Sequence, residues 1–518
     1  MTDSDAPAVS GEPSSLREAV FRAGVLGTVT AATALYAMAV TIANVALPQM
    51  QGAMAATTDQ IAWVITFNIV ATAIVTPMSG WLIFRFGRRR TMLCAVAGFT
   101  VASILCGTSN SLTELVVFRA FQGAFGAPIP PVAQAVILGT FPRHLHSKAL
   151  SVYGMGIVLG PIFSPTIGGY LAEMYSWRWV FFLLVPIALV TFAGVWYFLR
   201  ARVGEREQVR LDWVGLLALC IAVGSLQLLL DRGEREDWFN SPEIIIEVWV
   251  AAIAFYIFVV HTCTARQPFL SPHLLLDRNF SIGILLTLVF GMLFVTPVVL
   301  LPPLLQDLRG YPELAVGLLL AARSVGTLGG FFFILLFAEK IDPRVLLAMG
   351  FLFQGLSGYF MAQFDINLTA FGVAWTSCLQ GVGTGLMWVP LMTITFATLS
   401  QRDIPNGAAM FHLVRLIGSS VFISISVAVV IHTAKINYSN LAARASPFNE
   451  ALRSPGITEF WDLGSQQGLF ALASEINRQS LMIGYINGFY LYAVTALAVV
   501  PLLIFVRWKR PDNESAAG

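Results

Sequence analysis

The stretch GMGIVLGPIFSPTIGG, residues Gly154–Gly169, is apolar and uncharged, and it decides the fold. Small residues recur in it every four positions, at Gly156, Gly160, Ser164 and Gly168. On a helix this spacing places the small residues on one face, where the backbone of another helix can approach closely. Pro161 and Pro165 each remove a backbone donor, so we expect them to bend the helix. Neighbouring helices can satisfy the freed carbonyls in lipid, so the stretch predicts a membrane bundle.

The composition of the whole chain supports this prediction. The 518 residues are 57% hydrophobic and 12% charged, with a mean hydropathy of +0.74, whereas soluble domains carry about 25% charged residues. Apolar runs long enough to span a bilayer, about 20 residues each, predict an all-α polytopic protein with fourteen transmembrane helices. They lie near 24–47, 60–83, 91–109, 112–138, 149–171, 179–199, 213–230, 243–263, 280–302, 314–337, 343–362, 368–397, 407–433 and 484–506.

Charge and cysteine usage narrow the function classes. The net charge of +2 gives no reason to expect a nucleic-acid partner. The five cysteines show no metal-ligand spacing, and no nucleophile elbow or phosphate loop is present. We therefore expect no enzyme activity, metal or cofactor. Most of the 31 lysines and arginines fall in segments that share one side of the membrane, which predicts both termini in the cytoplasm.

Polar side chains inside the apolar spans are the candidate pathway residues. An intramembrane arginine costs at least about 2.5 kcal/mol, so Arg119 needs a partner or a cavity, and Gln122 shares its helix face. Arg323 either binds an anion or reaches toward the membrane surface, and both interpretations stay open. Asn44 either bonds a neighbouring helix or lines a cavity. Arg415 also lies inside a span, and His412, three residues before it, is interpreted as a packed polar residue.

Three stretches resemble motifs of the major facilitator superfamily. GWLIFRFGRRR, between the second and third spans, resembles its loop signature at Gly80, Leu82, Arg85, Gly87, Arg88 and Arg89. RAFQGAFGA, from Arg119, resembles the fourth-helix motif. The opening stretch resembles the fifth-helix motif of the exporters, with Gly160, Pro161, Gly168 and Gly169 matched after a two-residue expansion. With fourteen spans, the chain resembles the EmrB/QacA type of drug:proton antiporter, and it is closer to the EmrB branch.

The resemblance implies two pseudo-symmetric six-helix bundles with two inserted helices. We expect cytoplasmic tails at 1–20 and 511–518, bundles at 21–202 and 266–510, and the inserted pair at 203–265. An internal repeat should relate the bundles. FQGAFG at 121–126 is echoed by LQGVGTG at 379–385, which makes Gln380 a further pathway candidate. The implied gating and packing residues are Gly80, Arg85, Gly87, Arg88, Gly156, Gly160, Pro161, Gly168 and Gly169.

Three acidic residues that the family carries are missing. Their positions hold Ala39, Phe84 and Asn487. Glu114 is the first remaining acid to test, although it lies near a helix end. The resemblance therefore implies proton antiport, while the lost acids leave a facilitator without proton coupling as an alternative.

The segment 434–483 is expected to be a long, irregular outer loop. In EmrB-like proteins this face meets a periplasmic membrane-fusion adaptor of the EmrA type, followed by an outer-membrane channel, so the resemblance implies those partners and an inner-membrane location. The implied function is export of amphipathic or hydrophobic compounds by alternating access. The arginines, unbalanced by acids, favour substrates with an acidic group. A non-transporting sensor on the same fold is the alternative from another class.

Overall fold

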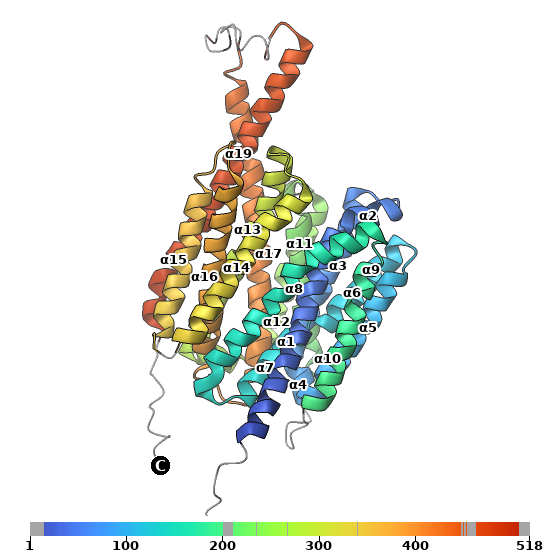
Figure 1. Cartoon of the computed structure of the whole chain (residues 1–518), viewed down its shortest axis with the longest axis vertical. Coiled ribbons are helices and arrows are strands. Elements are labelled where there is room, and N and C mark those ends of the chain that lie inside the picture. The colour runs from blue at the N-terminus through green and yellow to red at the C-terminus, as the bar shows by residue number, and fades with distance from the viewer. Residues whose placement is uncertain are drawn as a thin grey trace, which may run out of the picture.

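A computed structural model describes residues 15–199, 211–234, 236–266, 268–338, 340–446, 449, 452, 461 and 463–506. Regular structure in these residues is helical throughout, and the long helices run side by side as one bundle (Figure 1). Thirteen of the described helices are long and apolar enough to cross a membrane. The expected all-α, multi-span architecture is confirmed.

The first half of the protein comprises α1 to α10, which pack mainly on one another. Their bounds are α1 (Ser15–Val45), α2 (Leu47–Ala53), α3 (Thr58–Val75), η1 (Thr76–Met78), α4 (Ser79–Phe86), α5 (Arg88–Thr108), α6 (Leu112–Gly126), α7 (Ile129–Thr140), η2 (Arg143–Leu145), α8 (His146–Met174), α9 (Trp179–Phe182) and α10 (Leu184–Phe198). The second expected span is α3, η1 and α4 in succession, and the sixth is α9 followed by α10.

The remaining helices form the inserted pair and the second half. The inserted pair is α11 (Trp213–Arg232) and α12 (Pro242–Thr264), joined through η3 (Trp238–Asn240). The second half comprises η4 (Pro272–Leu276), α13 (Arg278–Pro303), η5 (Leu304–Leu308), α14 (Glu313–Phe337), α15 (Pro343–Met361), α16 (Ala370–Phe396), α17 (Ile404–Ala442), α19 (Gln466–Ala498) and η7 (Val500–Phe505).

Both ends of the described chain lie at one end of the bundle. Helix α1 begins there and η7 finishes there, which agrees with an even number of crossings (Figure 1). We call this the terminal end and the opposite one the arm end. Helix α1 begins at Ser15, within the expected tail at 1–20. The expected boundary at 202/203 and the tail at 511–518 lie outside the described residues.

The fourth expected span is not one helix, which corrects the sequence prediction. Residues 112–138 are divided into α6 and α7, which meet at Ala127 and Pro128. The string PIPP, with prolines at 128, 130 and 131, explains the division, since each proline lacks the N–H of a continuous helix. Neither α6 nor α7 alone is long enough to cross a membrane. Thirteen candidate spans therefore remain among the described residues.

The expected irregular loop at 434–483 is largely helical, which is a second correction. Helix α17 continues to Ala442 and α19 starts at Gln466, and both project beyond the bundle as an arm (Figure 1). The 39 residues of α17 correspond to about 58 Å at the α-helical rise, whereas the hydrocarbon core is about 30 Å thick. Helix α17 is therefore about twice as long as the hydrocarbon core is thick. Residues 447, 448, 450, 451, 453–460 and 462 of this segment lie outside the described residues.

The small-residue face of α8 packs directly on α1, as predicted. A Cβ atom at Gly160 would lie 2.6 Å from the carbonyl oxygen of Ala34, and one at Gly168 would lie 2.5 Å from Ile42 Cγ1. Between them, Ser164 Oγ donates to the carbonyl oxygens of Gly160 and Met38. Backbone contact of this kind is available only to residues without a side chain. Helix α8 runs without interruption from His146 to Met174, so the bend at its prolines stays a prediction.

We expect Gly160→Ala to destabilise the protein, because the added Cβ atom would push α8 away from the Ala34 carbonyl. The midpoint temperature for loss of the monodisperse detergent-solubilised peak should fall by several degrees. Gly27→Ala is the matched control in α1, since a Cβ atom there meets nothing within 4 Å. Alanine is also the better helix former, so this control should match or exceed the wild type. Equal midpoints for Gly160→Ala and the wild type would contradict the packing argument.

Candidate functional site

Arg119 is held in the first half by a buried polar cluster. Its side chain is 1% exposed, and its Nη1 donates to Gln122 Oε1 at 2.5 Å. The Nε atom donates to the carbonyl oxygen of Val64 on α3 at 3.3 Å. Gln122 in turn donates from Nε2 to Ser103 Oγ on α5 at 2.7 Å. The partner that the sequence requires for Arg119 is therefore an amide and a carbonyl.

Arg323 is held in the second half by a similar cluster. Its Nε donates to Gln380 Oε1 at 2.5 Å, and its Nη2 donates to the carbonyl oxygen of Phe294 at 2.6 Å. The guanidinium carbon also lies 4.8 Å from the centre of the Phe294 ring. These contacts run from α14 to α16 and α13, so the side chain points into the bundle. The interpretation of Arg323 as reaching toward the membrane surface is wrong.

The two clusters are related by the internal repeat. A Cβ atom at Gly123 would lie 2.3 Å from the carbonyl oxygen of Asn68, and one at Gly381 would lie 1.9 Å from that of Arg323. Gly123 follows Gln122, and Gly381 follows Gln380, so the glycines and glutamines correspond. Asn68 therefore corresponds to Arg323. The two arginines reach equivalent glutamines from different helices, which only the structure reveals.

Arg415 differs from the other two arginines because it lacks such a cluster. Its side chain is half-buried in α17, and its Nε atom is buried with no hydrogen-bond partner among the described atoms. The guanidinium carbon lies 5.9 Å from the centre of the Trp388 ring, a cation–π contact. It also acts electrostatically on the hydroxyls of Tyr36 and Tyr153, on α1 and α8 of the first half. Arg415 is thus a second-half cation facing the first half.

Three contacts join the two halves near the terminal end. His412 Nε2 lies 2.8 Å from Gln134 Oε1 on α7. The Asn406 side chain on α17 lies against Gly80 of α4, where a Cβ atom would meet its Oδ1 at 2.3 Å. The Phe331 ring on α14 lies against Gly154 of α8 in the same way, at 2.5 Å. We call these contacts the terminal-end closure.

The inserted helix α11 joins the halves closer to the arm end. Gln227 accepts a hydrogen bond from Ser420 Oγ, and the Leu230 carbonyl accepts one from Ser424 Oγ, both on α17. On its other side, Asp231 accepts from Thr66 Oγ1 on α3. One helix outside the two six-helix sets thus bonds to both of them. Its polar residues carry no motif that the sequence analysis could have used.

Several residues that the sequence analysis singled out lie outside the buried polar clusters. Asn44 is exposed in the last turn of α1. Glu114 is exposed in the first turn of α6, where its carboxylate accepts a hydrogen bond from the Asn110 N–H and its own N–H donates to the N-cap Ser111. Arg85 is exposed, and the Arg88 guanidinium lies over Gly139 of α7. Gly87 has a φ of +82° between α4 and α5, a backbone that glycine adopts without strain.

The three positions that lack the family acids are occupied by residues that do not titrate. Ala39 is 2% exposed in α1, and Phe84 and Asn487 are half-buried. Among the described residues, no carboxylate pairs with any of the three intramembrane arginines, and no group of His, Cys, Asp and Glu could hold a metal. A proton site therefore has to be sought among other groups.

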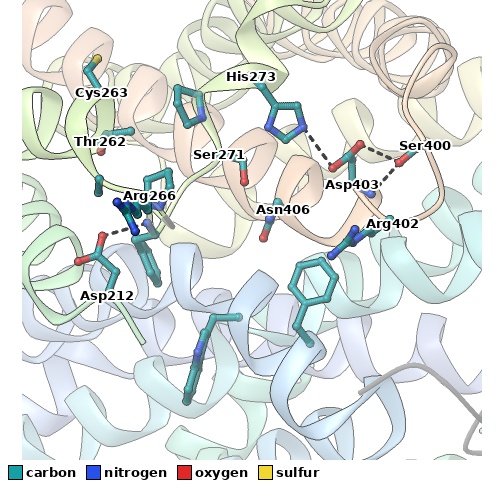
Figure 2. Close-up of a pocket in the computed structure, with 16 residues that line it drawn as sticks. Asp212, Thr262, Cys263, Arg266, Ser271, His273, Ser400, Arg402, Asp403 and Asn406 are labelled. Atoms are coloured by element: carbon teal, nitrogen blue, oxygen red, sulfur yellow. Dashed lines mark hydrogen bonds and ion pairs between the residues drawn. The ribbon is translucent and has the colours of Figure 1, made fainter. Parts of the chain in front are cut away.

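A pocket of about 860 Å³ opens at the terminal end, where α4, the end of α12, the linker to η4 and the start of α17 meet (Figure 2). Its charged and titratable lining residues are Asp212, Arg266, His273, Arg402 and Asp403. Asp403 accepts from Ser400 Oγ at 2.7 Å and lies 3.4 Å from His273 Nε2. The sequence analysis did not single out these residues, because their spacing along the chain follows no motif.

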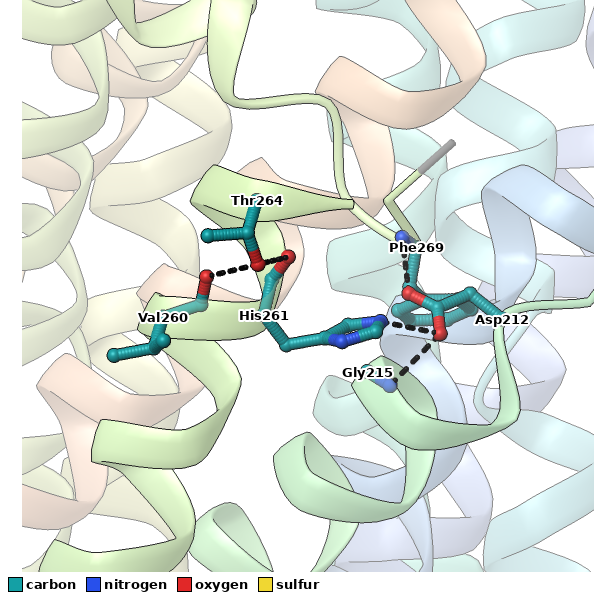
Figure 3. A network of polar contacts seen from close by, with 6 residues as sticks. All are labelled: Asp212, Gly215, Val260, His261, Thr264 and Phe269. Atoms are coloured by element: carbon teal, nitrogen blue, oxygen red, sulfur yellow. Dashed lines mark hydrogen bonds and ion pairs between the residues drawn. The ribbon is translucent and has the colours of Figure 1, made fainter. Parts of the chain in front are cut away.

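Asp212 forms hydrogen bonds with both inserted helices and with the linker that follows them (Figure 3). Its carboxylate caps α11 by accepting from the Gly215 N–H at 3.0 Å, and it also accepts from His261 of α12 at 2.8 Å and the Phe269 N–H at 3.1 Å. Burial alone would raise the pKa of Asp212. The hydrogen bonds to the charged form outweigh that effect and hold the pKa below its ordinary value.

Comparison with known proteins finds relatives over most of the chain. A family profile described as Major Facilitator Superfamily matches residues 29–423. The "Multidrug export protein EmrB" of Haemophilus influenzae is 35% identical over 489 residues, covering 93% of this chain and 94% of that protein. The "Fatty acid resistance protein FarB" of Neisseria gonorrhoeae is 30% identical, covering 92% and 94%.

A solved proton:xylose symporter of the same superfamily, XylE, has a similar fold. Its TM-score is 0.61 at 12% identity, and the match covers 93% of this chain and 95% of that one. At this identity the likeness concerns the fold alone, and it agrees with the arrangement of the helices described above.

We expect Asp212→Ala to destabilise the protein near neutral pH, because three donors lose their acceptor; a lost helix cap alone costs about 1 kcal/mol. The folded-state pKa of Asp212 is depressed, so its contribution is complete above the ordinary value of about 3.9 and is lost as the pH falls through the folded-state pKa.

The difference in melting temperature between wild type and Asp212→Ala should accordingly shrink once the pH falls below about 4. Glu173→Ala, at an exposed acid, is the control and should melt with the wild type at every pH. A difference that persists unchanged in acid would contradict the assignment to the ionised carboxylate.

Proposed function

The chain belongs to the major facilitator superfamily and is a multidrug-type efflux transporter, and we propose that it exports amphipathic compounds carrying an acidic group in exchange for protons. The observation that carries this substrate class is Arg415. It is the one of the three intramembrane arginines whose guanidinium Nε has no described hydrogen-bond partner. A buried, incompletely solvated cation attracts an anion strongly, because a low local dielectric weakens its own stabilisation.

The surroundings of Arg415 fit an amphipathic anion. Trp388 stands beside the guanidinium, and the Phe290 and Phe411 rings lie 5.3 Å and 6.0 Å from the Trp388 ring. An aromatic cluster next to a cation offers an apolar wall to a hydrocarbon or aromatic body and a charge to its acidic group. The printed name of the relative FarB, a fatty acid resistance protein, supports the same class of substrate.

The two halves can move substrate across the membrane by alternating access. The terminal-end closure joins α4, α7 and α8 of the first half to α14 and α17 of the second. Opening of that closure would admit substrate from the cytoplasm, provided that both termini are cytoplasmic, as the distribution of lysine and arginine predicts. We place the protein in the inner membrane on that basis.

A facilitator without proton coupling is the second candidate function. Ala39, Phe84 and Asn487 favour it, because none of them can carry a proton. The two functions differ in one measurable property, which is the response of transport to a pH gradient.

The arm is the proposed contact with a periplasmic adaptor, through which substrate would pass to an outer-membrane channel. It projects past the bundle (Figure 1), and it carries exposed apolar side chains. Leu469 and Phe470 on α19 are 47% and 77% exposed, and Ile436 on α17 is 48% exposed. Exposed apolar residues of this kind beyond the membrane are typical of a protein interface.

We expect Arg415→Ala to reduce export of an amphipathic anion by about 10- to 100-fold, the equivalent of one lost charge-assisted hydrogen bond. The measurement is uptake of a dansyl-labelled alkyl sulfonate into proteoliposomes. Its sulfonate stays ionised, so the probe does not cross the lipid unaided. Arg415→Lys keeps the charge but loses the planar, two-pronged donor geometry of the guanidinium. Its uptake rate should lie between those of the wild type and Arg415→Ala.

Arg444→Ala, at an exposed arginine after α17, is the matched control and should transport as the wild type does. Unchanged sulfonate transport by Arg415→Ala would overturn the proposed substrate class.

We expect Phe470→Ser to leave transport in proteoliposomes unchanged and to lower resistance in cells that carry the adaptor. The exposed ring contributes to docking and makes little contact within this chain. Leu472→Ser, at a buried position two residues along, should instead lower stability in both settings. Full resistance in cells expressing Phe470→Ser would argue against the arm as the adaptor contact.

A further inference from the structure

His412 holds a buried hydrogen bond between the two halves. Its ring is 5% exposed, and its Nε2 atom lies 2.8 Å from Oε1 of Gln134, which is fully buried on α7. An amide oxygen accepts and cannot donate, so Nε2 carries the hydrogen in this contact. The neutral imidazole therefore fits the closed arrangement with Nδ1 unprotonated.

The second ring nitrogen has no partner. His412 Nδ1 is buried, and none of the described atoms forms a hydrogen bond with it. A proton taken up at Nδ1 would create a buried N–H without an acceptor, together with a buried positive charge. Both changes are unfavourable at this site as long as the halves stay closed.

The charged surroundings oppose that proton further. Arg415, one turn along α17, is the charged group that acts on His412. On the other elements, the groups beside the ring are Gln134 of α7 and Trp388 of α16, whose ring centre is 6.3 Å from that of His412. The described parts of η1, α3, α4, α11, α13 and α19, which also pack on α17, add no charge that acts on it. Tyr36 and Tyr153 lie beside Arg415 and are neutral.

We propose that His412 is the proton-responsive group of the terminal-end closure: a proton on its ring opens the contact between the halves, and loss of that proton restores it. The imidazolium and Arg415 repel each other inside the closed contact, whereas an open contact lets water solvate both cations. This inference rests on the proposed export function and names the group through which protons act on it.

The proposed proton path is balanced and needs no other reactant. In the closed state Nδ1 takes one proton that entered from the arm side. Opening exposes the ring at the terminal end, where water accepts the same proton. The neutral ring then bonds Gln134 again as the halves close around the next exported molecule. In this way His412 would serve in place of the acids that are absent at Ala39, Phe84 and Asn487.

The transport test compares two variants that do not titrate with the wild type in proteoliposomes. The amide of His412→Gln reaches the position of Nε2 and can still donate to Gln134, whereas the shorter amide of His412→Asn removes the titrating ring and the contact together. With the dansyl-labelled alkyl sulfonate as probe, we expect His412→Gln to keep exchange at equal pH within about twofold. Both variants should lose the acceleration that a pH gradient gives the wild type. The matched control is His432→Asn, an exposed histidine on the same helix, which should behave as the wild type.

A conformational test decides the inference without any substrate. Spin labels at Phe86 of α4 and Val345 of α15, which are 43% and 50% exposed, report the separation of the halves once the native cysteines are replaced. As the pH falls from about 8 to about 5, the range in which imidazole titrates, the long-distance population should grow in the wild type and stay constant in His412→Asn.

The outcomes separate this inference from the proposed function. Gradient-accelerated transport or a pH-dependent distance that survives in His412→Asn overturns the role of His412, while export of an acidic amphipath stands. Wild-type exchange that does not respond to the gradient, together with a label distance that does not change with pH, also overturns the role of His412. That result favours the facilitator function. Absence of sulfonate exchange in the wild type removes the proposed substrate class, and the distance measurement still decides whether His412 controls the closure.

Discussion

The constraint on which this structure depends is the cost of a guanidinium inside an apolar bundle without a carboxylate to pair with it. Arg119 and Arg323 meet that constraint through neutral partners, a glutamine amide and a backbone carbonyl each. Such partners satisfy the donors but leave the positive charge in place. Arg415 lacks even these partners at Nε. The interior therefore keeps an uncompensated positive charge, which suits a transporter of anions better than a carrier of cations.

Close approach of helix backbones makes this arrangement possible. Gly123 and Gly381 let α6 and α16 approach the carbonyls of Asn68 and Arg323 closely. On α16 this approach brings Gln380 to Arg323 of α14, and on α6 it brings Arg119 to the Val64 carbonyl of α3. The repeat is preserved in these backbone contacts, while the arginine sits on α6 in the first half and on α14 in the second. Helix packing thus constrains the positions of the glycines and glutamines. It does not constrain which helix carries the arginine, and that helix differs between the halves.

The contacts between the halves combine apolar packing with a few hydrogen bonds, and the hydrogen bond between His412 and Gln134 lies near the terminal end. Hydrogen bonds of this kind can be broken and remade at modest cost, unlike an extended apolar interface. The inserted helix α11 adds hydrogen bonds to both halves on the arm side. A helix pair added to a two-bundle transporter can therefore influence the equilibrium between its conformations. Among the residues named in the terminal-end closure, His412 is the one whose side chain is an imidazole, which can take up a proton when water reaches it.

Local sequence determined the all-α, multi-span architecture, the small-residue face of α8 and the presence of three arginines inside apolar helices, because hydropathy and helical spacing act within one segment. It also contained the prolines that divide α6 from α7, although an uninterrupted apolar run concealed their effect. Tertiary structure alone decided that Arg323 points inward and that His412 bonds Gln134 across 278 positions of chain. Those outcomes depend on which helices lie side by side, and no spacing along one helix encodes its neighbours.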